Sequence, residues 1–87
     1  MTKGEYKVGI NFNPSNDDMV GKIKRAAADL IDLIEMIPLP QEQAPLGEYK
    51  RQQSHSAEVG RLKALAQTEV ESAAMWAVKA ATKGQMA

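Results

Sequence analysis

The sequence predicts an all-α protein, an antiparallel two-helix hairpin with an extended N-terminal arm that assembles into a homo-oligomeric helical bundle. Two long segments carry apolar residues at steps of three and four, and a loop with three of the four prolines separates them. The 87 residues are the size of one domain. Many apolar residues are alanine and none is cysteine, so one copy can bury little core and oligomerisation is the expected remedy.

The arm, residues 1–15, is expected to be extended. Tyr6, Val8, Ile10 and Phe12 alternate with more polar residues, and a period of two is typical of a strand with one packed face. The segment from Asn13 to Asn16 (NPSN) then predicts a turn.

The first helix is expected over about 16–37. Ser15 or Asn16 would cap it, and Asp17 and Asp18 would place negative charge at the positive end of its dipole. Pro38 would help to end it. The apolar seam of this helix consists of Val20, Ile23, Ala27, Leu30, Ile34 and Ile37.

A loop over 38–53 and a second helix over about 54–82 complete the hairpin. Ser54 or Ser56 would start this helix, and Gly84 fits its end. Its main stripe consists of Leu62, Ala66, Glu69, Ala73, Trp76 and Ala80. Together the two helices carry more apolar surface than a hairpin can hide, which predicts packing against other subunits.

Charge and hydropathy argue against DNA and membrane partners. Eleven basic residues balance eleven acidic ones without separating along the chain, so there is no basic stripe to attract a nucleic acid duplex. No apolar run approaches the roughly 20 residues of a membrane span, and no signal-peptide pattern is visible. We therefore expect a soluble protein of a reducing cytosol.

Catalysis, metal binding and cofactors are not indicated either. His55 is the only histidine, at a position where a capping or solvent-exposed residue is expected, and there is no cysteine, metal-ligand spacing or glycine-rich phosphate loop. Asp29, Asp32 and Glu35 recur at helical spacing, which predicts an exposed acidic face. The sequence favours a binding protein over an enzyme.

The end of the arm contains the ingredients of a nucleotide site. Phe12 could stack on a base, the Asn13 amide offers a donor and an acceptor, and Pro14 belongs to the same candidate site. Because aspartates occupy the start of the helix, phosphate should meet Lys24 or Arg25 instead. The alternative is that Phe12 is a core anchor and Lys24 a solvated side chain.

The stretches FNPS, VGKIKRAAADLIDLIE and RLKALAQTEVESAAMWAVKAAT together resemble the phage hairpin-domain sponges over roughly residues 10–83. These are anti-CBASS proteins related to the anti-Thoeris sponges, and they sequester cyclic-oligonucleotide immune messengers without cleaving them. The resemblance implies a homohexamer in the cytosol of an infected bacterium, with cyclic dinucleotides held between N-terminal regions of paired subunits. It also implies that Phe12, often tyrosine in the family, stacks on the base and that Lys24 meets phosphate.

Some members hold cyclic trinucleotides in a separate threefold pocket, and the resemblance assigns Arg61, with Thr68 on the same face, to such a site. The alternative there is a solvated helix face. Two other functions stay open: a structural or adaptor hairpin whose apolar surface binds a protein partner, and, with the least support, a small DNA-binding regulator.

Overall fold

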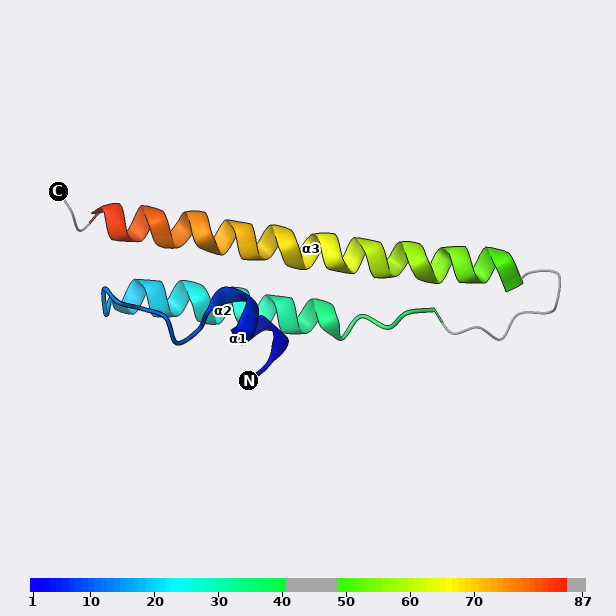
Figure 1. Cartoon of the computed structure of the whole chain (residues 1–87), viewed down its shortest axis with the longest axis horizontal. Coiled ribbons are helices and arrows are strands. Elements are labelled where there is room, and N and C mark those ends of the chain that lie inside the picture. Colours follow the sequence, from blue (N-terminus) through cyan, green and yellow to red (C-terminus); the bar gives the residue numbers. More distant parts are fainter. Residues whose placement is uncertain (41–48, 85–87) are drawn as a thin grey trace.

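The computed structural model describes residues 1–40 and 49–84, and side chains over 1–40 and 54–84. It contains three helices in these ranges, α1 (Lys3–Val8), α2 (Asp18–Glu35) and α3 (Tyr49–Gly84), and no strand among the described residues. The molecule is elongated, 63 × 22 × 13 Å; α2 and α3 lie antiparallel and α1 packs on α2 (Figure 1). The predicted all-α hairpin is confirmed. None of the described helices is long and apolar enough to span a membrane.

The extended N-terminal arm was a wrong prediction, because residues 3–8 form α1. The Thr2 hydroxyl accepts from the main-chain N–H of Glu5, and the Glu5 carboxylate accepts from the Thr2 N–H at 2.8 Å, a complete capping box. At the other end Gly9 has φ 62°, and the N–H groups of Gly9 and Ile10 return to the carbonyls of Tyr6 and Glu5. Local hydrogen bonds therefore help to define both ends of this short helix.

A close backbone approach seats α1 on α2. A Cβ atom on Gly4 would lie 2.9 Å from the Cα and 2.8 Å from the carbonyl carbon of Ala28, so only glycine fits without a shift. The Gly4 N–H lies in the first turn of α1 and has no acceptor within the helix, and it donates to Asp32 at 2.7 Å. Gly4 is buried and Ala28 is fully buried as a result.

Ion pairs flank this contact on both sides. Lys3 pairs with Glu35 at 2.8 Å, and Glu5 pairs with Arg25 at 2.8 Å. Arg25 also pairs with Asp29 at 2.8 Å. The acidic residues of α2 were expected to form an exposed face. Instead, Asp32 and Glu35 bind α1, and Asp29 orients Arg25.

The predicted turn before α2 forms, but the helix begins later than expected. The Asn16 N–H donates to the Asn13 carbonyl at 3.0 Å and closes the turn. Asn16 has φ 53°, in the left-handed region, whereas a capping residue is normally extended. Asp17 is extended and caps α2 by accepting from the Met19 N–H at 3.0 Å, so the cap is neither Ser15 nor Asn16.

The end of α2 is held by a side chain from α3. The helix stops at Glu35, and the Lys63 ammonium donates to the main-chain carbonyls of Glu35 at 3.0 Å and Ile37 at 2.6 Å. A cation at a helix C-terminus satisfies unpaired carbonyls and matches the dipole. The helix thus ends two residues before the expected end at 37, and the Lys63 contact ties this end to α3.

The core between the helices is small and rotated from the predicted seam. Val20 and Ala27 of the predicted seam are buried, but Leu30 is 45% exposed, and the packed face also includes Ala28 and Ile31, both fully buried. The rotation arises because α2 is covered by α1 as well as by α3. Across the interface, the buried Gln67 amide donates to the Ile31 carbonyl at 3.2 Å. Buried apolar side chains among the described residues are Val20, Ala27, Ala28, Ile31 and Ala74.

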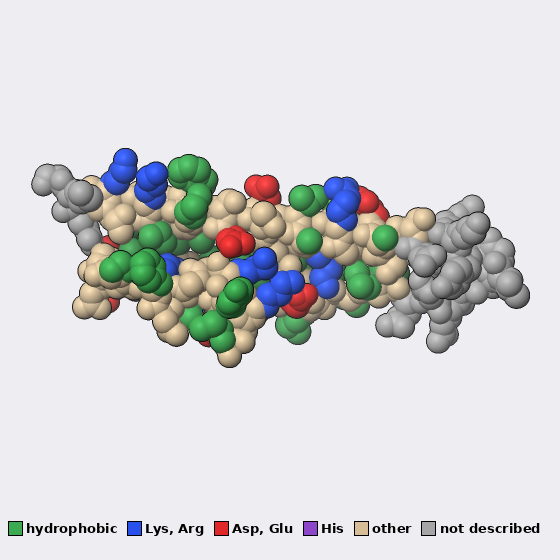
Figure 2. All heavy atoms as spheres, viewed as in Figure 1, with side chains coloured by type: hydrophobic (Ala, Val, Ile, Leu, Met, Phe, Trp, Pro, Cys, Tyr) green, Lys and Arg blue, Asp and Glu red, His purple; other side chains and the backbone are tan. Residues whose placement is uncertain are grey.

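Helix α3 begins at Tyr49, earlier than the serines expected to start it, and reaches Gly84. Of the predicted loop, residues 49–53 are helical and residues 41–48 lie outside the described part of the chain. The large residues of the predicted stripe are exposed: Leu62 is 51% and Trp76 61% exposed. Hydrophobic side chains stand out on the visible face in Figure 2. One copy therefore leaves apolar surface uncovered, as expected, while assembly into an oligomer stays a prediction.

Candidate functional site

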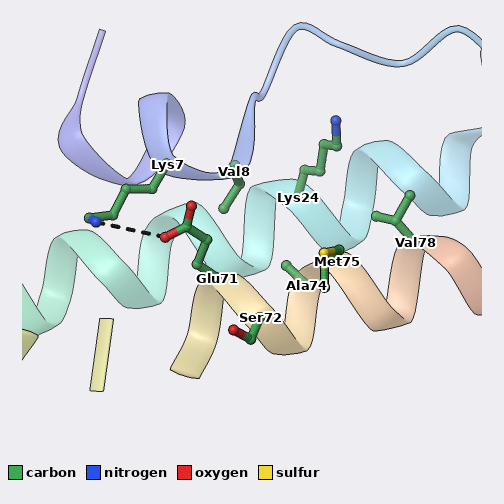
Figure 3. Close-up of a pocket in the computed structure, with 8 residues that line it drawn as sticks. All are labelled: Lys7, Val8, Lys24, Glu71, Ser72, Ala74, Met75 and Val78. Carbon is green, nitrogen blue, oxygen red and sulfur yellow. Dashed lines mark ion pairs between the residues drawn. The ribbon is translucent and has the colours of Figure 1, made fainter. Parts of the chain in front are cut away.

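Lys24 lies at the centre of the candidate site. Its side chain is only 7% exposed, and its ammonium donates to the main-chain carbonyl of Gly9 at 2.9 Å and to that of Phe12. In Figure 3 the amine points away from α3 and toward the chain that follows Val8. Lys24 is thus a buried cation bound to the loop between α1 and α2, not the solvated residue that was the alternative.

Phe12 has a fixed backbone and an exposed ring. Its N–H donates to the Gly9 carbonyl at 2.9 Å, while its carbonyl accepts from Lys24. The side chain is 72% exposed, and the centre of its ring is 5.4 Å from the Lys24 nitrogen. Within one chain the ring is available for stacking, and it is not packed in a core.

Asn13 and Pro14 shape the loop next to this ring. The Asn13 amide nitrogen donates to the Asp17 carbonyl at 3.0 Å, and its amide oxygen accepts from the Ser15 hydroxyl at 2.9 Å. Pro14 is exposed. Asn13 therefore ties the loop to the start of α2 and is less available to a ligand than the sequence indicated.

Arg25, the other candidate for phosphate, is committed to the contact between α1 and α2. Its hydrogen bond to Glu5, assisted by the Thr2 N–H, lowers the pKa of that carboxyl from 4.5 to about 2. Glu5 and then Asp29 raise the pKa of the guanidinium above its ordinary value. The structure thus brings Lys24, and not Arg25, to Phe12.

A cavity of about 410 Å³ lies beside Lys24, where all three helices meet. Across its edge Lys7 of α1 faces Glu71 of α3 at 3.7 Å, the pair joined by a dashed line in Figure 3. Its lining residues are Lys7, Val8, Lys24, Glu71, Ser72, Ala74, Met75 and Val78. Phe12 does not line it.

Sequence reasoning missed this cavity. Glu71, Ala74 and Val78 are spaced to share one face of α3, which was a usable signal. What could not be seen is that α1 folds back over that face, because the arm was taken to be extended.

A family model, the Acb2/Tad1 hairpin domain, matches residues 5–82, nearly the whole chain. The chain belongs to the Acb2/Tad1 hairpin family. This is the family of anti-CBASS and anti-Thoeris sponges, so the resemblance inferred from the sequence is confirmed. Comparisons with curated proteins and with solved structures returned no match.

The second candidate site of this Acb2/Tad1 protein, Arg61 and Thr68, lies on α3 alone within one chain. Arg61 is exposed and pairs with Glu58 on its own helix at 2.5 Å, which lowers the pKa of that carboxyl. Thr68, two turns further along α3, is also exposed. Neither residue lines the cavity beside Lys24, and one chain brings no partner from α1 or α2 to Arg61 in the described hydrogen bonds and ion pairs.

The only histidine of the sequence lies outside the candidate site. His55 is exposed on α3. Among the described residues no three His, Cys, Asp or Glu side chains are grouped as a metal site would require.

Proposed function

We propose that this protein binds cyclic dinucleotides and sequesters them without cleaving them, in the cytosol of a bacterium infected by a phage. The observation that supports the proposal best is the pairing of an exposed Phe12 ring with the buried Lys24 ammonium 5.4 Å from it. In a family of cyclic-oligonucleotide sponges, these are an aromatic surface for a base and a cation for a phosphate.

The ligand would lie against the loop between α1 and α2. A base stacks on Phe12, and a phosphate oxygen accepts the Lys24 proton that faces neither carbonyl, since an ammonium has three donors and two are in use. Asn13 and Pro14 keep the loop in shape, and Arg25 acts indirectly by pairing with Glu5 and holding α1 on α2. The second half of the site comes from a paired subunit of a homohexamer.

Isothermal titration with a panel of cyclic dinucleotides tests binding, and digestion of the complex by protease tests sequestration. We expect saturable binding and recovery of the intact ring. A linear nucleotide product would show that the protein is an enzyme, and no binding to any member of the panel would overturn the proposal.

Cyclic trinucleotides are a second proposed ligand class, at a threefold axis of the hexamer. Three copies of Arg61 around such an axis would match three phosphates, with Thr68 one heptad further on the same face. Arg61 would then exchange Glu58, its partner in the single chain, for phosphate. Arg61→Ala should abolish trinucleotide binding and leave dinucleotide affinity unchanged; loss of both, or of neither, contradicts two separate pockets.

The exposed residues of α3 also favour an alternative, a structural or adaptor hairpin that binds a protein partner through Leu62 and Trp76. The two functions predict different effects of Trp76→Ala. An adaptor would lose its partner while the oligomer persists, whereas the sponge needs this surface only for its own assembly.

A further inference from the structure

The hydrogen bonds of Lys24 have a role that does not require a ligand. Both carbonyls that accept from its ammonium belong to the connection between α1 and α2, at Gly9 and Phe12. We propose that Lys24 is a positioning residue: its buried ammonium gathers these two carbonyls and thereby fixes the loop that presents Phe12 before any nucleotide binds. The inference rests on the proposed function only where it takes Phe12 as the stacking residue.

Burial is what gives Lys24 this role. Lys24 as a whole is only 7% exposed, so its ammonium depends on protein acceptors to offset the water that it loses. The two carbonyls supply those acceptors, and the nearby Phe12 ring adds a favourable cation contact. The same bonds that stabilise the cation therefore hold the loop.

The backbone conformation at Gly9 places its carbonyl where it can accept from this ammonium. Gly9 adopts a left-handed φ of 62° as it ends α1, and its carbonyl accepts from both Lys24 and the Phe12 N–H. A Cβ atom added at Gly9 would lie 4.0 Å from the Lys24 nitrogen. The end of α1, the loop and the lysine of α2 thus meet at one point.

Lysine suits this position better than arginine. Its three donors point in tetrahedral directions from one nitrogen, so two can meet carbonyls while the third stays available to a phosphate. A guanidinium spreads its donors in a plane and matches carboxylate or phosphate edges instead. Loop positioning and phosphate binding can consequently use the same side chain at the same time.

The absence of cysteine from the sequence permits a chemical test. In Lys24→Cys, the new thiol is the only one in the chain, and alkylation with 2-bromoethylamine in denaturant followed by refolding restores an ammonium at nearly the same distance. Hydrogen exchange of residues 9–16 is then followed by mass spectrometry without ligand. We expect exchange roughly ten- to hundredfold faster in Lys24→Cys and a return toward wild type after alkylation, as loss and recovery of charge-assisted hydrogen bonds require.

Lys22→Cys is the matched control, because Lys22 is exposed on the same helix. Neither this substitution nor its alkylation should change exchange at 9–16. The proposal is overturned if Lys24→Cys exchanges like wild type there, or if alkylation restores nothing while the segment around Ile31 is protected. A role in general stability alone would instead accelerate exchange at Ile31 and at 9–16 together.

A measurement on the unaltered protein covers the case in which Lys24→Cys does not fold. Scalar coupling between the lysine ¹⁵Nζ and the carbonyl carbons of Gly9 and Phe12 in ligand-free protein would support the inference, and a freely rotating amine with no coupling would overturn it. Titration with cyclic dinucleotide is scored separately. A wild-type protein that shows this coupling yet binds none refutes the proposed function and leaves the positioning role intact.

Discussion

Phe12 is the residue at which stacking on a ligand and packing in a core predict opposite outcomes. Its ring is 72% exposed, so Phe12→Ala should leave the melting temperature close to that of wild type. Loss of a base stack should weaken cyclic dinucleotide binding by about 1–3 kcal/mol. Phe12→Tyr keeps the ring and should bind at least as well. Titration and thermal melting of both variants check this; an alanine variant that melts several degrees lower but binds normally would make Phe12 a packing residue.

At the scale of the element, α1 depends on the glycine that touches α2. Gly4→Ala places a Cβ against the Ala28 backbone and should destabilise the docked helix by about 1–3 kcal/mol, the usual cost of overpacking. Gly21→Ala is the control, because a Cβ at Gly21 meets nothing within 4 Å. This substitution within α2 should stabilise the helix by about 0.5–1 kcal/mol. Denaturation and exchange of residues 3–8 measure both. Equal behaviour of the two variants would disprove the close contact.

Docking of α1 should also depend on pH. Hydrogen bonding to Arg25 lowers the pKa of Glu5 to about 2, and Lys3 lowers that of Glu35. Groups with a depressed folded pKa stabilise above their unfolded value, here 4.5, and that stabilisation is lost as pH falls toward 2. Exchange of residues 3–8 should therefore accelerate relative to α2 across this window. Glu5→Gln should weaken this pH dependence of exchange. An unchanged pH dependence would show that Glu5 does not link α1 docking to pH.

Periodicity predicted α2 and α3 well, because long helices repeat their apolar residues many times. It failed at α1, where Tyr6 and Val8 suggested alternation, although Thr2 and Glu5 already formed a capping-box pattern and Gly9 a stop signal. Six residues hold too few turns for a helical repeat to show.

The candidate site divides in the same way. Phe12 could be chosen from residue chemistry, which left Lys24 and Arg25 as alternatives, and the family resemblance favoured Lys24. The structure brings Phe12 and Lys24 together. The burial of Lys24 could not be predicted, because its acceptors are main-chain carbonyls, which every residue possesses and no sequence pattern marks. The pairing of Arg25 with Glu5 could not be predicted either, because Glu5 belongs to α1, which was expected to be an extended arm.

At the scale of the whole molecule, the exposed apolar residues of α3 predict assembly. Trp76 is 61% exposed, so Trp76→Ala should not carry the several kcal/mol cost of emptying a core within one chain. If other copies cover it, Trp76→Asp should shift the oligomer toward the 9.5 kDa monomer in light scattering. Ser54→Asp, which adds the same charge at an exposed position of α3, should not. A wild-type protein that is monomeric at micromolar concentration contradicts this prediction.

Helix α3 has 36 residues and α2 has 18, and α2 ends opposite Lys63, so a long stretch of α3 continues beyond it. In that stretch Leu39 approaches Gly60, where an added Cβ would lie 3.7 Å from it, and most described side chains from Ser54 to Glu58 are exposed. Such a helix opens by local unfolding from its thinly covered end. In a lone chain, protection should therefore decline steadily from Ala74 toward Ser54. The extra protection of the same residues in an assembled protein would measure how much stability neighbouring copies lend to this part of α3.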